Sequence, residues 1–384
     1  MKYLIYSVLF FLFPDHLFCQ HNKESIDSLL RTYYKDNVPG AFVLISKNNH
    51  TIFKKGYGLA NLQTKEKISS NTSFNIGSLT KQFTAFSIVQ FAAKKQLSLQ
   101  DKLIKYFPGF NTKTGSLITI RQLLTHRSGI IDHYAFTDTS HIKHAADTDV
   151  LNAVKNIDST YFIPGTKYRY SNTAYCLLAL IIEKISGMPY NDYIKKNIFT
   201  PLSMRHAVVL QTGKPIYNQA YGYDYDSSNN KFSKLDADEA IFFSTEGDGG
   251  IYASADEYLL WYQSLQKPLP VNKSTVQKCR SPQFMIDTLN KLSYGYGWFV
   301  SEKDAVKAVY HTGSNGGFRA IVFSVPSENY MITIFSNRTG IDLEKLVQQI
   351  NEILGVTNNS FTKIEALVSF INSSPIFAPC KEII

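Results

Sequence analysis

The chain has 384 residues, enough to bury a substantial core as one large domain or as two closely packed lobes. Its composition, 44% hydrophobic and 18% charged, is typical of a folded globular protein and excludes a disordered or coiled-coil chain. The net charge of +9 would suit an anionic partner, but the Lys and Arg residues are scattered in ones and twos. We therefore expect no nucleic-acid partner.

The first 19 residues form a predicted targeting segment. Lys2 precedes an apolar run, Tyr3 to Phe13, which has the length of a signal-peptide core and is too short to span a bilayer. We predict a bacterial-type signal peptide over residues 1–19, cleaved before Gln20, and an exported protein that is periplasmic or secreted. Two alternatives stay open: Cys19 carries a lipid that associates the protein with a membrane, or the segment is retained as an anchor.

Hydrophobic periodicity then predicts the elements along the chain. Near the N-terminus we expect a helix around Ile26 to Tyr33 and two strands, Gly40–Ser46 and Thr51–Gly58. The expected helices that follow are Leu79–Lys95, Ile120–Thr125, Ala174–Ile185 and Pro189–Ile198. The C-terminal part is expected to hold the strands Tyr294–Val300, Val306–Tyr310, Phe318–Val325 and Tyr330–Ser336, then a helix, Asp342–Leu354.

Strands therefore occupy both ends of the chain and helices its middle. This order predicts an α/β (α+β) fold in which the N- and C-terminal segments share one antiparallel sheet flanked by helices. We expect a mainly helical lobe over roughly residues 100–240, within one domain covering residues 20–355. Residues 356–384 are expected to form a tail of uncertain order, with one further helix at Phe361–Ile371 as a candidate.

A first candidate site is Ser78-Leu79-Thr80-Lys81, where a loop enters the predicted helix at Leu79. If Ser78 opens that helix, Lys81 lies one turn further on the same face, so the two side chains can meet. A buried Lys with a lowered pKa can serve as the base that a Ser nucleophile needs. The motif alone is weak, because Ser-x-x-Lys starts at five serines: Ser78, Ser140, Ser228, Ser264 and Ser360. Only Ser78 precedes a long apolar helix.

Two further motifs follow in the sequence. Tyr170-Ser171-Asn172 is the only Tyr-x-Asn and directly precedes a predicted helix, where its Asn could also be a simple helix cap. His311-Thr312-Gly313 is expected at the end of a strand and continues into Ser314-Asn315-Gly316-Gly317, where glycines let backbone approach a ligand closely. A literal Lys113-Thr114-Gly115 lies in a polar loop before Tyr170 and is interpreted as a decoy.

In this order and spacing, the three motifs resemble those of the serine β-lactamase and penicillin-binding-protein superfamily. The match is closest to its class C branch, which includes D-alanyl-D-alanine carboxypeptidases, D-aminopeptidases and related esterases. Supporting stretches extend the resemblance over most of the chain: Ile118–Ile130, Phe162–Ser171, Ile181–Tyr193 and Gly247–Ala255. The resemblance implies a β-lactamase/transpeptidase-like fold for residues 20–355.

The resemblance also implies roles for the motif residues. Ser78 would attack the substrate carbonyl, and Lys81 would take its proton, alone or through Tyr170, which later protonates the leaving group. Asn172 would help to position the substrate, and the backbone N–H groups of Ser78 and Ser314 would form the oxyanion hole. The remaining substrate-binding residues would be His311, Thr312 and Gly313. The implied partner is a small-molecule or peptide substrate, with no metal or organic cofactor.

His311 changes the expected substrate. β-Lactamases of this branch usually carry Lys at that position, and a Lys cation attracts the carboxylate of a β-lactam, whereas His is mostly neutral at pH 7. The preceding stretch Leu292–Val300 supplies no Arg or Lys instead. We therefore expect hydrolysis of esters or D-amino-acid-containing amides. A D-alanyl-D-alanine carboxypeptidase or β-lactamase is the alternative.

Two other classes of function fit the sequence less well. A zinc hydrolase would use His133, His141, His144, Asp132 and Asp138, but this segment lacks a helical His-Glu-x-x-His arrangement. A catalytically inactive binding or sensor relative would have lost Ser78, Lys81 or Tyr170, and all three are present.

The remaining polar residues that stand out are interpreted as structural. His126 is expected to be half-buried, and Asp248 to brace a loop near the cleft. Cys176 is expected to be a buried free thiol, whereas Cys279 and Cys380 could pair in an oxidising compartment.

Overall fold

The computed structural model describes residues 14–137, 143–236, 241–267, 273–303 and 306–356. Its helices are α1 (Pro14–Tyr33), α2 (Thr80–Ala93), α3 (Leu103–Tyr106), α4 (Thr112–Leu117), α5 (Ile120–Leu124), α6 (Asp147–Val154), α7 (Asn172–Ser186), α8 (Tyr190–Ile194), α9 (Ala255–Ser264), α10 (Lys273–Cys279) and α11 (Leu343–Ile353). Short turns of other helix types include η1 (Gly77–Leu79), η2 (His133–Ala135), η3 (Lys195–Phe199), η4 (Ile241–Ser244) and η6 (Pro326–Glu328). Its strands are β1 (Ala41–Lys47), β2 (His50–Tyr57), β3 (Phe74–Asn75), β4 (Val208–Val209), β5 (Tyr223–Asp226), β6 (Lys231–Lys234), β7 (Ile251–Ala253), β8 (Phe284–Asp287), β9 (Leu292–Tyr294), β10 (Phe299–Ser301), β11 (Ala308–Asn315), β12 (Phe318–Val325) and β13 (Tyr330–Ser336).

One large antiparallel sheet joins the two ends of the chain. Within the described residues it has eight strands in the order β2-β1-β13-β12-β11-β10-β9-β8. Strand β1 pairs with β13 from Ala41↔Ser336 to Ser46↔Met331, so the first and last strands of the chain are direct neighbours. The predicted fold class, with its sheet shared by the N- and C-terminal segments, is therefore confirmed.

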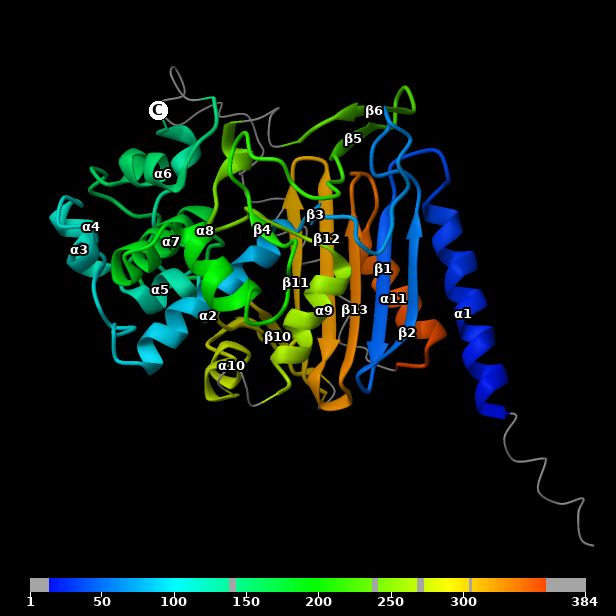
Figure 1. Ribbon diagram of the computed structural model, residues 1–384. Helices are drawn as coiled ribbons and strands as arrows, with labels where there is room; N and C mark the ends of the chain where they lie inside the picture. The colour runs from blue at the N-terminus through cyan, green and yellow to red at the C-terminus, as the bar shows by residue number, and fades with distance from the viewer. Residues whose placement is uncertain (1–13, 138–142, 237–240, 268–272, 304–305, 357–384) are drawn as a thin grey trace, which may run out of the picture.

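Alternation along the central strands sends side chains into two separate cores. In β13, Ile332 and Ile334 face a core closed by α1 and α11, whereas Met331 and Phe335 face the core on the opposite side. Figure 1 shows α1 at the outer edge beside β2, α11 behind the sheet and α9 in front of it. Because both faces are covered, β1 and β13 are apolar along nearly their whole length.

The second core continues from the sheet into the helical part of the molecule (Figure 1). Helix α2 lies at its centre and is buried on every side, polar side chains such as Lys81, Gln82 and Thr84 included. A helix that is buried all round must satisfy each polar group inside the protein. Each buried polar side chain of α2 therefore needs a hydrogen-bond partner within the protein.

Several predicted elements differ from those observed. The first helix begins at Pro14, well before Ile26, and Lys113-Thr114-Gly115, interpreted as part of a loop, lies in α4. The strand expected over Tyr294–Val300 is two short strands, β9 and β10, because Gly297 adopts a left-handed conformation (φ +83°) where the chain passes close to the Lys81 carbonyl. The strand expected to stop at Tyr310 runs on to Asn315 as β11, so it contains the His311 motif. The helix expected up to Ile198 is α8 followed by the π-helical turn η3.

Several predictions fall partly outside the described residues. Residues 1–13 and 357–384, with Cys380, are not described, and residues 14–19 begin α1. Signal cleavage, lipidation of Cys19, the tail helix, the domain limits and a Cys279–Cys380 bond therefore stay predictions. Within the described residues, none of the helices combines the length and the apolar character that a membrane span requires.

Candidate active site

Ser78 lies on a tight turn between the sheet region and the buried helix. Strand β3 pairs with β7, and η1 then leads directly into α2. The turn is held by Asn75, whose side-chain oxygen accepts from the Gly77 N–H at 2.7 Å, and by the Ile76 N–H, which donates to the Ile251 carbonyl at 3.0 Å. Ser78 is half-buried, so its hydroxyl sits on a rigid support and remains accessible.

Two glycines let the Ser78 turn and strand β11 approach each other at backbone distance. A Cβ on Gly77 would lie 2.7 Å from the Ser314 nitrogen, and a Cβ on Gly313 would lie 2.1 Å from the Ile76 carbonyl oxygen. Gly77 also has a φ of +53°, which favours glycine. The backbone of the third predicted motif is therefore in direct contact with the backbone of the first.

Lys81 is completely buried and bonded to oxygens from three parts of the chain. Its Nζ lies 3.0 Å from Ser78 Oγ, 2.8 Å from Asn172 Oδ1 and 2.8 Å from the Asp248 carbonyl oxygen. Burial lowers the pKa of Lys81 to about 8, against the opposing effects of Asp248 and Cys176. This amine is consequently much easier to deprotonate than an exposed lysine.

Tyr170 and Asn172 enter the site from the start of α7. The helix is capped by Ser171, whose hydroxyl accepts from the Ala174 N–H at 3.1 Å, so Asn172 is free to bond to Lys81. The Tyr170 ring centre lies 4.9 Å from Lys81 Nζ. Burial raises the pKa of the Tyr170 hydroxyl, while Ser78 acts to lower it, and no described residue makes a hydrogen bond of good geometry with this hydroxyl.

His311 is buried and held as a neutral ring. Its Nδ1 lies 2.6 Å from the Thr312 carbonyl oxygen, which can only accept, so Nδ1 carries the proton and Nε2 accepts from the Tyr294 hydroxyl at 3.2 Å. Burial, together with the nearby Lys81, lowers the pKa of His311 to about 3. The third motif therefore offers no cation at neutral pH. Ser314, three residues on, is exposed.

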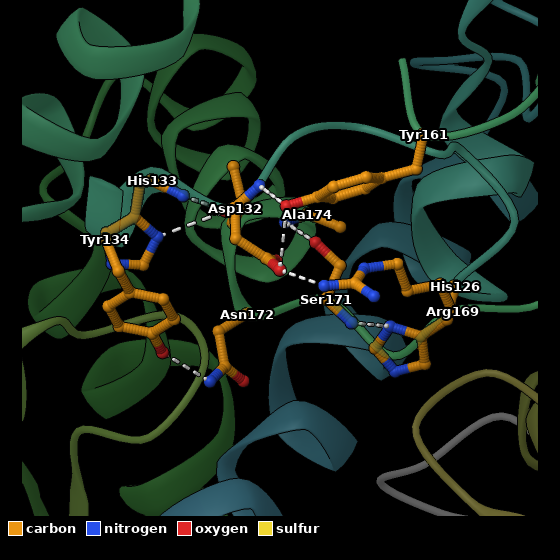
Figure 2. A network of polar contacts seen from close by, with 10 residues as sticks. His126, Asp132, His133, Tyr134, Tyr161, Arg169, Ser171, Asn172 and Ala174 are labelled. Carbon is orange, nitrogen blue, oxygen red and sulfur yellow. Dashed lines mark hydrogen bonds and ion pairs between the residues drawn. The ribbon is translucent and has the colours of Figure 1, made fainter. Parts of the chain in front are cut away.

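The structure thus brings together the predicted residues Ser78, Lys81, Tyr170 and Asn172, and it sets His311, Gly313 and Ser314 beside them. Thr312 lies between them on β11, where its carbonyl contacts His311. The structure adds two groups that the sequence did not identify: the Asp248 carbonyl, which accepts from Lys81, and the Tyr134 hydroxyl, which accepts from Asn172 Nδ2 at 2.8 Å (Figure 2). Asp248 lies in one of the stretches that carried the family resemblance, which was a usable signal. Tyr134 lies in the short helical turn η2 and gave none.

Of the residues proposed for a zinc site, those that the structure describes do not form a metal-ligand group. Asp132 forms an ion pair with Arg169 at 2.8 Å (Figure 2). His133 Nδ1 lies 3.1 Å from Thr173 Oγ1. His144 lies 3.4 Å from Ser244 Oγ, and His141 and Asp138 are outside the described residues.

Among the residues that the structure describes, one buried group has metal-ligand proximity, and it contains no histidine: Asp147, Cys176 and Asp248. Its members are already partnered. Cys176 Sγ donates to Asp248 Oδ1 at 3.5 Å, and Asp147 accepts from the Glu246 and Gly247 N–H groups. Cys176 is a buried free thiol, as predicted.

The sequence from residue 25 to residue 353 matches the family described as Beta-lactamase. The chain belongs to this family. Among characterised relatives of this β-lactamase-family chain, Protein flp of Staphylococcus aureus (strain MW2) is 30% identical over 335 residues, which cover 86% of this chain and 66% of the relative. The chain therefore spans just under two thirds of the length of that relative.

Solved structures with the same fold include the octameric penicillin-binding protein homologue from Pyrococcus abyssi, with a TM-score of 0.74 and 24% identity over 88% of this chain and 77% of that one. A class C beta-lactamase has a TM-score of 0.73 and 20% identity over 90% of this chain and 98% of that one. These likenesses confirm the expected β-lactamase/transpeptidase-like fold and the resemblance to penicillin-binding proteins and class C β-lactamases.

The contact between the Ser78 turn and β11 can be tested at Gly313. In Gly313→Ala the new methyl group would collide with the Ile76 carbonyl, so we expect a loss of stability of about 1–3 kcal/mol from overpacking. Urea unfolding measures it. Gly109→Ala is the matched control, because a Cβ there meets no atom of the described residues within 4 Å. Equal unfolding midpoints for the two variants would contradict this close contact.

Proposed function

We propose that this protein is a serine hydrolase that forms an acyl ester on Ser78 and acts on an ester or an amide. The observation that carries the proposal is the bond between Ser78 Oγ and the buried Lys81 amine, 3.0 Å apart. Proton removal from a Ser hydroxyl requires a base within hydrogen-bond reach whose pKa is close to the working pH. Lys81, with a pKa of about 8, meets both conditions.

The three partners of Lys81 also orient its lone pair. As an ammonium, Lys81 has three N–H groups for the three oxygens around it. After it loses a proton, two N–H groups remain. The Asp248 carbonyl and the Asn172 amide oxygen can only accept, so they keep those two donors. The lone pair is then directed at the Ser78 hydroxyl, which supplies a proton to it.

The proposed reaction follows from this arrangement. Ser78 Oγ attacks the substrate carbonyl carbon and gives its proton to Lys81, directly or through Tyr170. The negative charge on the carbonyl oxygen is stabilised by the backbone N–H groups of Ser78 and Ser314, which the Gly77 contact brings close together. Tyr170 protonates the leaving group as its bond to the carbonyl carbon breaks, and Lys81 passes the proton that it took from Ser78 back to Tyr170. A water molecule then attacks the acyl carbon, the ester bond to Ser78 breaks, Ser78 Oγ regains a proton and the free acid is released.

The preferred substrate is proposed from the charge of the site. A β-lactam or a peptide end brings a carboxylate, and the position where a cation would meet it holds the neutral, buried His311. This favours esters and D-amino-acid-containing amides. The family membership keeps a second candidate in view, a D-alanyl-D-alanine carboxypeptidase or β-lactamase acting on cell-wall peptide or β-lactams. For both candidate functions the partner is a small-molecule or peptide substrate. The N-terminal segment supports the proposal that the protein is exported.

The nucleophile is tested by substitution. We expect Ser78→Ala to abolish covalent labelling by fluorophosphonate or fluorescent penicillin probes, because no acyl acceptor is left beside Lys81. Ser228→Ala is the matched control, since Ser228 also starts a Ser-x-x-Lys sequence but is exposed and bonded to Asp226. Labelling that survives in Ser78→Ala would mean that another residue is the nucleophile.

The base is tested by pH. Only neutral Lys81 can accept the Ser78 proton, so kcat/KM should rise about tenfold per pH unit below the pKa of about 8 and level off above it. Hydrolysis of a p-nitrophenyl ester, corrected with Ser78→Ala at each pH, measures the profile. A rate that is flat or falls as the pH rises towards 8 would contradict the role given to Lys81.

The substrate preference is tested with a panel of p-nitrophenyl esters, D-Ala-D-Ala peptides and nitrocefin. We expect turnover of esters or D-amino-acid amides to exceed that of nitrocefin, because His311 supplies no charge for the nitrocefin carboxylate. Strong nitrocefin turnover without esterase activity would reverse the order of the two candidates while leaving Ser78 as the nucleophile.

A further inference from the structure

His126 contacts the Tyr170 segment at three points. Its backbone carbonyl accepts from the Arg169 N–H at 2.9 Å, and its ring Nδ1 accepts from the Ser171 N–H at 3.1 Å. Between these two bonds its ring packs on the Tyr170 ring, with centres 4.2 Å apart and planes at 31°. Figure 2 shows the His126 ring directed at the Ser171 nitrogen. His126 thus fixes the backbone on both sides of Tyr170, at Arg169 and Ser171, and also packs against the Tyr170 ring.

The hydrogen bond with Ser171 fixes the protonation of the His126 ring. The Ser171 N–H can only donate, so Nδ1 must be unprotonated and the single proton of the neutral ring is on Nε2. The ring is fully buried and also packs against Tyr175 and Tyr294, with ring centres 5.1 Å and 4.7 Å away. Burial and the nearby Lys81 hold the pKa of His126 well below its usual value, which keeps Nδ1 an acceptor.

The backbone conformation of His126 also allows its contacts on both sides of Tyr170. His126 has a φ of +56°, a left-handed conformation that few non-glycine residues adopt and that costs free energy. In this conformation the carbonyl and the ring of one residue both reach the chain on either side of Tyr170. The Tyr170 hydroxyl is close enough to Ser78 for Ser78 to lower its pKa, but it makes no hydrogen bond of good geometry with any described residue. The contacts with His126 are therefore better placed to fix the ring than any bond at the hydroxyl.

We propose that His126 is a positioning residue for catalysis, which holds the Tyr170 hydroxyl beside Ser78 and Lys81. His126 acts through Tyr170 and does not touch the reacting atoms. The inference rests on the proposed function and adds a residue to it, one that the three motifs do not contain. A small displacement of an acid–base group can cost on the order of 100-fold in rate, so a residue that fixes Tyr170 should have a measurable effect.

A double-mutant cycle between His126 and Tyr170 tests the proposal. The first variant is His126→Gly, because glycine adopts a positive φ without strain and removes both the ring and its acceptor. The second is His126→Asn, which tolerates the same φ and returns an acceptor near the position of Nδ1. Each is made alone and with Tyr170→Phe. The readout is the second-order rate constant for fluorophosphonate labelling, with thermal unfolding and near-UV circular dichroism as checks of folding.

We expect His126→Gly to slow labelling at least about tenfold and His126→Asn to recover most of that loss. In the Tyr170→Phe background, where no hydroxyl is left to position, either His126 substitution should change the rate less than about threefold. If His126→Gly does not fold, the Asn variant completes the cycle: its smaller loss should likewise vanish in the Tyr170→Phe background. Losses that multiply in the double variants would overturn the inference and leave the proposed function standing.

Two further outcomes test the role of Tyr170 and the specificity of the His126 effect. Labelling at the unchanged rate in Tyr170→Phe would remove the role proposed for Tyr170, and with it the role of His126. His206→Ala is the matched control, because His206 stacks on Tyr217 with ring centres 4.1 Å apart, outside the site. It should label at the original rate. If His206→Ala slowed labelling as much as His126→Gly, breaking any His–Tyr stack would lower the rate. That result would also overturn the inference.

Discussion

The site depends on burying one amine. Taking a lysine out of water is costly unless each of its N–H groups meets an acceptor. Lys81 meets this demand with oxygens from three separate segments: the Ser78 turn, the start of α7 and the loop that precedes β7. If one segment shifted, a buried donor would lose its partner. The need to satisfy Lys81 therefore holds the three segments together. Burial lowers the pKa of Lys81, and the three contacts direct its amine at Ser78.

The surrounding fold is arranged to keep those segments in place. Asp147 accepts from the Glu246 and Gly247 N–H groups, and Thr84 on α2 donates to the Gly247 carbonyl at 2.7 Å, so the loop that carries the Asp248 carbonyl is tied to two helices. On the other side, the backbone contact of Gly77 and Gly313 sets the Ser78 turn against the central sheet. Helix α2 thus carries the amine, while the sheet carries the groups that would bind substrate.

Much of this arrangement could be predicted from the sequence, for identifiable physical reasons. The shared sheet follows from apolar runs at both ends of the chain, and the meeting of Ser78 with Lys81 follows from helical spacing. The order of the three motifs supplied the family. What could not be predicted depends on backbone. The Gly247–Ala255 stretch marked the loop of Asp248, but no residue type in it shows that the Asp248 carbonyl accepts from Lys81. The continuation of β11 through His311 likewise depends on its register with β12. His126 was expected to be half-buried, but four tyrosine rings enclose it completely.

The central claim is that Ser78 carries the acyl group, and mass spectrometry tests it most directly. The protein is exposed to a substrate panel, quenched in acid and measured intact, and the modified peptide is then located by tryptic digestion. We expect a mass increase equal to the acyl group, on Ser78 within the peptide that spans residues 68–81. Turnover without any adduct under rapid quenching, or an adduct on a residue other than Ser78, would contradict it.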